Sequence, residues 1–176
     1  VNGGPSSELE TIADVLFTCL VMAQKQILAV TPYFVPTIDI LRALRVAALR
    51  GVDVRLVVPK ENNHFYAGLA GKALYEELLA SGVRIFERKP PFIHSKAMII
   101  DDMLAVAGTA NLDVRSLRLN YETNMVIYDD NLVNQLKGII VSEVAQSEEL
   151  ELAQWKQRSR GRRLLENFCS LLTPIL

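Results

Sequence analysis

The sequence predicts an α/β fold with a mixed, mostly parallel β-sheet that is flanked by helices on both faces. Stretches with the apolar spacing of helices alternate with short runs of β-branched residues, as in the helix over 38–50 and the strand over 54–58. Continuous apolar runs of this kind are typical of strands covered on both faces. With 176 residues, 50% of them hydrophobic, the chain can bury one sizeable core.

The first half of the chain predicts alternating helices and strands. Ser6 or Ser7 can cap a first helix with an apolar stripe, and residues 26–31 read as the first strand. The helix over 38–50 ends at Gly51, and the strand over 54–58 completes a β-α-β unit.

A loop at 61–63 leads to the next predicted helix, from about Leu69 to Ala80, which is closed by Gly82. A strand near 83–87 follows. His64 lies in the loop, and we expect it to be a plain exposed histidine rather than a substrate contact.

Apolar runs predict the strands of the second half. The strands over 95–100 and 104–107 are expected to form a hairpin through Asp101-Asp102. Another strand begins at Glu122, and a long helix over 132–146 completes the layers.

Charge and cysteine usage narrow the class of protein. A formal net charge of -1 offers no broad cationic surface for nucleic acid, so no nucleic-acid partner is expected. Cys19 and Cys169 lie in apolar surroundings without metal-ligand spacing and read as buried thiols, with a disulfide as the lesser alternative. No metal or other cofactor is expected.

The most specific feature of the chain is the pattern H-x-K-x4-D-x6-G-[ST]-x-N. It is formed by His94, Lys96, Asp101, Gly108, Thr109 and Asn111. Exchange or cleavage of a phosphodiester needs a nucleophile, an acid for the leaving alkoxide, and positive charge around the phosphoryl oxygens. An imidazole can serve as nucleophile or, when protonated, as the acid. The pattern therefore indicates chemistry on a phosphodiester.

The spacing assigns different tasks to the motif residues. In a strand, His94 and Lys96 point to the same face and would grip one phosphate together. Asp101 is separated from His94 by an odd number of residues, so we interpret it as a turn or cap residue rather than a direct participant.

Gly108 is expected to let the backbone turn sharply, while Thr109 and Asn111 can donate hydrogen bonds to phosphoryl oxygens. Both are also ordinary turn residues. Arg115 follows the motif closely, and it can line the site or form a structural ion pair.

The motif and its surroundings resemble the phospholipase D superfamily, and within it the second catalytic half of bacterial cardiolipin synthases. The supporting segments are 31–36, 50–55, 108–116 and 120–122. The resemblance implies a phospholipase D-like fold, with His94, Lys96 and Asp101 as catalytic residues. It also implies that Asn111, Thr109 and Glu122 bind or orient the phosphate, with Glu122 paired to the motif histidine.

The implied activity is phosphatidyl transfer between phospholipids through a phosphohistidine, which makes cardiolipin from phosphatidylglycerol. Because the chain carries one motif, an N-terminal catalytic half of the same protein or a second copy would supply the other histidine. One alternative is a homodimeric single-motif phosphodiesterase, acting as a phospholipase or a nuclease. Another is a non-catalytic module for assembly or membrane docking.

Two regions are expected, a phospholipase D-like catalytic domain over 1–150 and a basic amphipathic tail over 151–176. The tail can lie in the interface of an anionic membrane, or it can pack on the protein. The chain has no apolar stretch long enough for a membrane span. It starts at Val1 rather than methionine, so we expect an excised piece of a larger protein. That protein is expected at the cytoplasmic side of the cell membrane, with its anchors elsewhere.

Overall fold

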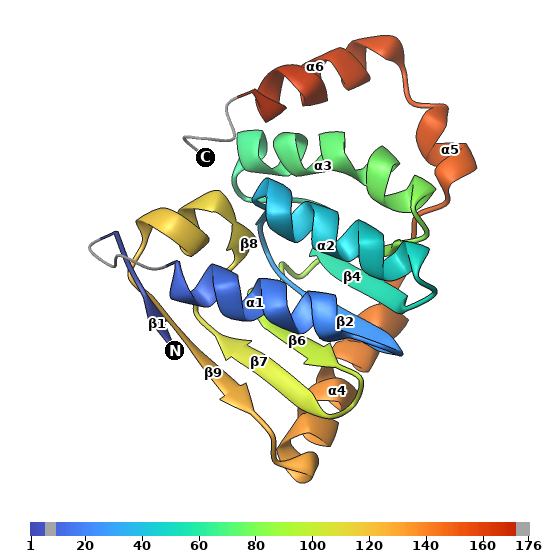
Figure 1. The fold of residues 1–176 in the computed structure, drawn as a ribbon. Helices are drawn as coiled ribbons and strands as arrows, with labels where there is room; N and C mark the ends of the chain where they lie inside the picture. Colours follow the sequence, from blue (N-terminus) through green and yellow to red (C-terminus); the bar gives the residue numbers. More distant parts are fainter. Residues whose placement is uncertain (6–9, 172–176) are drawn as a thin grey trace.

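We describe the fold from a computed structural model, which covers residues 1–5 and 10–171 (Figure 1). The predicted cap at Ser6 or Ser7 and the last apolar residues of the tail lie outside these ranges. The elements are β1 (Asn2–Gly3), α1 (Thr11–Met22), β2 (Gln26–Val30), β3 (Phe34–Val35), α2 (Ile38–Leu49), β4 (Asp53–Pro59), α3 (Phe65–Ala80), β5 (Arg84–Arg88), β6 (Ala97–Ile100), β7 (Leu104–Gly108), β8 (Leu112–Asp113), the π-helical turn η1 (Arg115–Leu119), β9 (Glu122–Ile127), α4 (Asp130–Ala145), β10 (Ser147–Glu149), α5 (Leu152–Lys156) and α6 (Arg160–Ser170).

The main sheet has eight strands in the order β1-β9-β7-β6-β2-β4-β5-β10, and β3 pairs with β8 in a separate two-stranded ladder. The prediction of a mostly parallel sheet is wrong. Only β2, β4 and β5 run parallel, because α2 and α3 cross over between them, whereas every other pair in the main sheet is antiparallel. The apolar runs indicated burial on both faces, and antiparallel strands can be buried in that way too.

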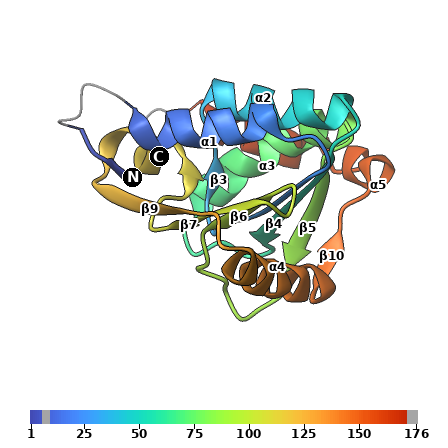
Figure 2. The same ribbon diagram turned by 60° about the horizontal axis from the view of Figure 1, so that its bottom comes forward.

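Helices cover both faces of the sheet, as predicted. Figure 2 shows α1, α2 and α3 on one side of the strands and α4 on the other. On the α1–α3 side, Leu20, Leu44 and Leu78 pack into the larger core. On the α4 side, Val133 and Ile140 pack against the opposite face of the strands. The motif strand β6 therefore lies in the middle layer, between helices on both sides. This packing fixes the position of its N-terminal end, which His94 and Lys96 precede.

Glycine ends the two crossover helices as predicted. Gly51 and Gly82 have positive φ angles of 91° and 93°, a backbone conformation that side chains with a Cβ rarely adopt. The start of α3 differs from the prediction because Phe65 and Tyr66 form a first turn that is exposed and outside the apolar stripe. Asp129 starts α4 early, since its carboxylate accepts a hydrogen bond from Leu132 N.

The predicted hairpin of the motif is present. β6 pairs with β7 from Ala97–Ala107 to Ile100–Leu104, and the turn uses positive φ at Asp101 and Asp102. The strand was expected over 95–100 but begins at Ala97, so residues 95 and 96 precede the ladder.

The C-terminal helices pack on the rest of the protein through part of their surface. Trp155 of α5 is buried beside Tyr75, and Glu166 and Cys169 of α6 are buried against α3. Cys19 is also buried, and both cysteines are free thiols. Among the described residues, no helix combines the length and the apolar character needed to cross a lipid bilayer.

Candidate active site

His94 and Lys96 meet on the surface at the leading end of β6. The Lys96 Nζ lies 3.1 Å from Nδ1 and 3.3 Å from Nε2 of the His94 ring, and it donates a 2.8 Å hydrogen bond to the His94 carbonyl oxygen. The imidazole is exposed, while the buried Ile93 beside it anchors the segment in the core. The ammonium and the ring are thus brought to one point, as the motif predicted, although the segment is not a strand.

The backbone of this segment is tied to the neighbouring strand. Gly108 N donates to the Lys96 carbonyl oxygen at 3.2 Å, one hydrogen bond before the β6–β7 ladder begins. Burial lowers the pKa of the Lys96 ammonium, while the carboxylates of Glu122 and Asp113 act in the opposite direction. The two acidic groups offset the burial only in part, so the pKa of Lys96 lies below its ordinary value.

Glu122 stands at the start of β9, near the lysine rather than in contact with the histidine. Its Oε1 accepts a 3.3 Å hydrogen bond from Asn120 Nδ2. Within the described residues, the His94 ring contacts Lys96, Tyr33 and Phe92, and no hydrogen bond joins it to Glu122. The pair implied by the family resemblance is not formed in this structure.

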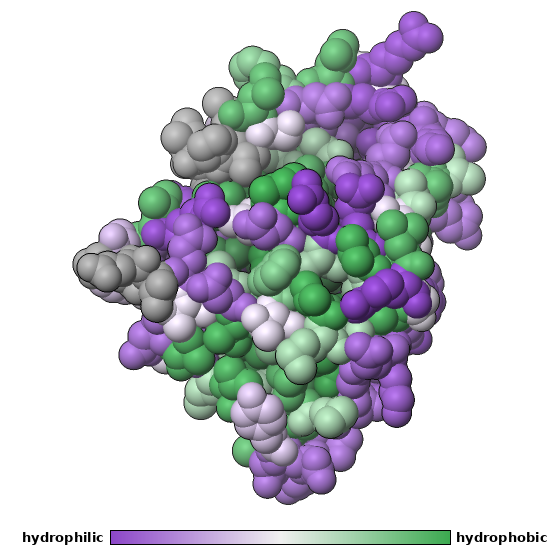
Figure 3. Space-filling model, viewed as in Figure 1, coloured by the Kyte–Doolittle hydropathy of each residue, from purple (hydrophilic) through white to green (hydrophobic). Residues whose placement is uncertain are grey.

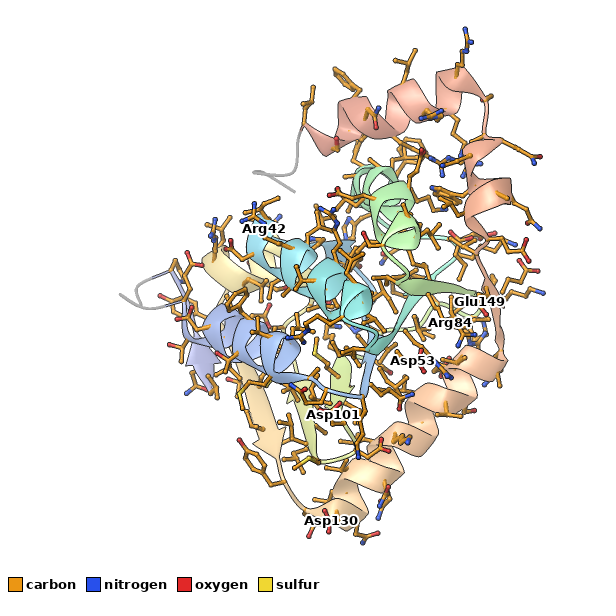
Figure 4. The ribbon with its side chains drawn as sticks, turned by 45° about the vertical axis from the view of Figure 1, so that its right-hand side comes forward. Arg42, Asp53, Arg84, Asp101, Asp130 and Glu149 are labelled. Carbon is orange, nitrogen blue, oxygen red and sulfur yellow. The ribbon has the colours of Figure 1, made fainter. Side chains whose placement is uncertain are left out.

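Asp101 sits at the other end of β6, where it closes the start of β2. Its carboxylate accepts three backbone hydrogen bonds, from Gln24 at 2.7 Å, Lys25 at 2.7 Å and Gln26 at 2.9 Å. Figure 4 shows it at the end of the β6–β7 hairpin, apart from the ion pairs of Asp53, Arg84 and Glu149. Burial would raise the pKa of Asp101, but the three N–H donors outweigh it and the pKa lies below its ordinary value. This agrees with the structural interpretation of Asp101 and gives it no contact with the reactive pair.

Gly108 is needed for a close approach and not for the sharp turn that the sequence suggested. A Cβ at this position would lie 2.2 Å from the Thr123 carbonyl oxygen and 2.3 Å from Asn124 Oδ1. The Thr109 hydroxyl accepts from Thr123 N at 2.9 Å, so it is engaged with the backbone of β9. Thr109 thus holds the motif loop against β9 in this structure.

Asn111 belongs to a buried polar network below the site. Its Nδ2 donates to Ser116 Oγ at 2.9 Å, and Ser116 N donates to Asp113 Oδ1 at 2.6 Å. Burial raises the pKa of the Asp113 carboxyl, and hydrogen bonds from Ser116 oppose this only in part. The Oδ1 of Asn111 is buried and accepts no hydrogen bond among the described residues.

Two further residues shape the site and were not singled out from the sequence. The Tyr33 ring meets the His94 ring edge-on at 6.5 Å between centroids. Asn124 is buried and accepts a hydrogen bond from Ala110 N at 3.2 Å, which fixes the motif loop. An asparagine on the same face of a strand as Glu122 was the available signal for the second of these.

Thr31 connects the two segments that carry these residues. Its hydroxyl donates to the Tyr33 carbonyl oxygen at 2.8 Å and accepts from Leu112 N at 3.2 Å. Leu112 directly follows Asn111 in the motif loop, so one buried hydroxyl sets the spacing between the tyrosine and that loop.

A cavity of about 460 Å³ opens beside the site, and Tyr33 and Asn111 form part of its wall. His64, which we expected to make no substrate contact, lies in the same wall. Its ring is edge-on to the Tyr33 ring, with 5.3 Å between the centroids. Within residues 1–5 and 10–171, no group of three or more His, Cys, Asp or Glu side chains is placed to hold a metal ion.

The whole chain is similar in sequence to known proteins. The family described as "Cardiolipin synthase, PLD-like domain" matches residues 16–142. Cardiolipin synthase 2 of Bacillus anthracis is 40% identical over 176 residues, all of this chain and 34% of that protein. Cardiolipin synthase A of Proteus mirabilis is 36% identical over 176 residues, which cover 36% of it. The chain thus spans about a third of the length of the curated relatives it matches.

Solved structures share the fold. A phosphatidylserine synthase from Haemophilus influenzae aligns over the whole chain and 47% of its own length, with a TM-score of 0.79 and 18% identity. Nuc from Salmonella typhimurium, a phospholipase D family member, aligns over 78% of this chain and 90% of its own, with a TM-score of 0.69 and 23% identity.

Proposed function

This chain belongs to the family of phospholipase D-like domains of cardiolipin synthase, and from that premise we propose that it is one catalytic half of a phosphatidyltransferase. In this proposal it is the C-terminal half of a two-motif enzyme. The enzyme passes the phosphatidyl group of one phosphatidylglycerol to a second one, which yields cardiolipin and glycerol.

The reaction proceeds in two displacements at one phosphorus atom. An imidazole nitrogen attacks the phosphorus of the donor, the bond to the headgroup oxygen breaks, and a second, protonated imidazole gives its proton to the leaving glycerol. The hydroxyl of the acceptor then attacks the phosphohistidine. Its proton goes to the second imidazole, the phosphorus–nitrogen bond breaks, and both histidines return to their starting forms. His94 is one of the two imidazoles.

The observation that carries the proposal is the convergence of His94 and Lys96. Their side-chain nitrogens lie 3.1 Å apart, so a phosphate that meets the imidazole also meets the ammonium. A fixed cation beside the phosphoryl oxygens stabilises the charge that develops there in the transition state. His94 is also exposed, which leaves room for a second motif to approach it.

The second motif is proposed to come from the remainder of a longer protein. The chain spans about a third of the length of its curated relatives, and its sequence contains one copy of the motif. A two-histidine reaction therefore needs a partner, and an N-terminal half of the same protein would supply it.

A membrane surface is the proposed setting, on the cytoplasmic side of the cell membrane. Leu164 and Phe168 of α6 are 70% and 63% exposed, and Leu171 directly after it is 75% exposed. Arg160 stands at the start of the same helix. Hydrophobic atoms stand out over α6 at the top of the view in Figure 3. An exposed apolar stripe with arginine beside it suits the interface of an anionic bilayer.

The test is the variant His94→Ala in the complete enzyme, with lipid products followed from labelled phosphatidylglycerol. Loss of the nucleophile or the acid is expected to lower cardiolipin formation by at least about a thousandfold. Thermal unfolding serves as the folding control, because the exposed imidazole contributes little to the core. Undiminished cardiolipin formation would remove the proposal.

A rival function is a homodimeric single-motif phosphodiesterase, which the exposed His94 and the single motif also suit. In that case two copies of this chain would bring their histidines together. A dimer in solution that cleaves lipid or DNA with water as the acceptor would favour it. A chain that stays monomeric and shows no hydrolysis would rule it out.

A further inference from the structure

The cavity beside the site reaches away from His94 between the start of α3 and the turn η1. Tyr33 separates it from the reactive pair, since its ring lies 6.5 Å from the His94 ring and 5.3 Å from the His64 ring. The cavity is about 460 Å³, enough for a headgroup rather than a whole lipid. A molecule bound in the cavity would be separated from the reacting phosphorus by the Tyr33 ring.

The loop that carries His64 is fixed to the tyrosine. The Tyr33 hydroxyl donates to Asn63 Oδ1 at 2.7 Å, and Asn62 Oδ1 accepts from His64 N at 2.8 Å. Asn62 also donates to the Pro32 carbonyl oxygen at 3.0 Å. These contacts hold the histidine in place at the cavity wall without any substrate.

The charged groups of the wall favour an anion. Arg115 is exposed and forms no ion pair within the described residues, whereas Arg118 on the same turn pairs with Glu10 at 3.0 Å. Asp113 is the acidic side chain among the lining residues, and burial raises the pKa of its carboxyl. His64 and the start of α3, whose N–H groups carry partial positive charge, add to the attraction.

The rim of the cavity is apolar and aromatic. Phe65 and Tyr66 are both exposed at the first turn of α3, and Val35 lines the wall nearby. A small inorganic anion would gain nothing from these rings. An anion with attached hydrocarbon would bury them, so the lining suits a phospholipid.

We propose that this cavity binds the phosphate of the acceptor lipid, with Arg115 and His64 on its oxygens and the aromatic rim against its glycerol backbone and acyl chains. The inference rests on the proposed function. In cardiolipin formation the attacking hydroxyl belongs to a glycerol whose other end carries a second phosphate. A site for that second phosphate beside His94 would aim the hydroxyl at the phosphohistidine and would disfavour water as the acceptor.

The test is a competition between two acceptors in the complete enzyme, with labelled donor and both phosphatidylglycerol and ethanol present. Ethanol lacks a phosphate, so the ratio of cardiolipin to phosphatidylethanol reports the acceptor site alone. Arg115→Gln is expected to lower this ratio by about tenfold or more, the usual effect of losing one charge-assisted hydrogen bond. The loss should appear as a higher KM for phosphatidylglycerol. His64→Gln is expected to lower the ratio less.

Arg118→Gln is the matched control, because this arginine lies on the same turn, is exposed, and is outside the cavity wall. It should leave the ratio unchanged. An Arg115→Gln variant with an unchanged ratio, or with equal loss of both products, would overturn the inference. A wild-type enzyme that forms phosphatidylethanol but no cardiolipin would instead refute the proposed function, so the two failures are distinct.

Discussion

The ammonium nitrogen of Lys96 lies 3.1 Å from Nδ1 of His94 and donates a 2.8 Å hydrogen bond to the carbonyl oxygen of the same residue. The side chain is therefore folded back onto the histidine instead of extending into solvent. A phosphate placed against the imidazole would find the ammonium already in position, with little rearrangement during the reaction.

The first prediction concerns Lys96→Met, which removes the charge and keeps most of the length. We expect turnover to fall by about a hundredfold to a thousandfold, the usual cost of losing one group that stabilises transition-state charge. The free energy of unfolding should change little, because Lys96 makes no salt bridge among the described residues. Steady-state kinetics and chemical denaturation measure the two effects.

The control for this prediction is Lys137→Met. This lysine is paired with Asp102 at 2.7 Å on the surface, at the end of β6 that is remote from the histidine. Its turnover should match the wild type. Equal losses in both variants would mean that the overall charge matters, rather than the position of the ammonium.

The second prediction separates a structural aspartate from a catalytic one. In Asp101→Asn, the two carboxylate oxygens that accept three N–H groups are replaced by one acceptor and one donor. We expect about 2 kcal/mol of lost stability at pH 7, with turnover at permissive temperature nearly unchanged. Asparagine still tolerates the positive φ of 52°, so backbone strain does not confuse the result.

The stability lost in Asp101→Asn should depend on pH. The pKa of Asp101 is lower in the folded state than in the unfolded chain, so its stabilising contribution is present above the unfolded value near pH 4 and is lost as the pH falls through the folded value. The difference between wild type and Asp101→Asn should therefore shrink below about pH 4. Asp102→Asn, with one surface ion pair, should change stability by less than about 1 kcal/mol.

The third prediction concerns the glycine of the motif. Gly108→Ala would place a Cβ 2.2 Å from the Thr123 carbonyl oxygen, and the ladder to β9 would have to shift. We expect a loss of about 3 kcal/mol together with reduced activity, because Gly108 N also donates to the Lys96 carbonyl oxygen on the other side of β7. Gly138→Ala in α4 has open space around its Cβ and should instead stabilise the protein by about 0.5–1 kcal/mol. Thermal unfolding of both variants measures the contrast.

The elements that the sequence predicted correctly are those set by residues close together in the chain. The β-α-β unit of β2, α2 and β4 follows from local periodicity and from Gly51, and it was predicted almost to the residue. The direction of the outer strands is set by pairing across the sheet, so the apolar runs could not reveal it. The odd separation of Asp101 from His94 predicted a turn or cap role, and the Asp101 carboxylate does accept three backbone hydrogen bonds beside the turn, although residues 94–96 lie outside the strand.

In the candidate site, too, the sequence predicted the contact between neighbouring residues but not the contacts between distant segments. The pairing of His94 with Lys96 needs only two residues of chain, and the motif predicted it. The close approach that requires Gly108 comes from β9, and the wall formed by Tyr33 and His64 comes from segments far apart in sequence. His64 is exposed, as expected, and it also forms part of the cavity wall, which its own loop sequence could not indicate.

The last prediction concerns the exposed stripe of α6. Its buried face holds Glu166 between Arg158 and Arg162, and Arg163 pairs with Glu76 of α3, so the apolar residues face outward. We expect the double variant Leu164→Glu/Phe168→Glu to weaken binding to vesicles of phosphatidylglycerol and phosphatidylcholine by at least about tenfold. Insertion of one such side chain contributes roughly 1.5–3 kcal/mol, and carboxylates would be repelled by the anionic lipid. Stability should be unchanged, because both positions are exposed.

Cosedimentation with vesicles is the measurement, and Leu49→Glu/Met22→Glu is the control, since these two side chains are equally exposed on α2 and α1. If the stripe binds the bilayer, only the α6 variant should lose affinity, and a lower fraction of anionic lipid should weaken wild type toward it. If both double variants bind vesicles as well as wild type, the stripe instead belongs to a protein contact. In that case the α6 variant should fail to assemble with the remainder of the enzyme, which size-exclusion chromatography would detect.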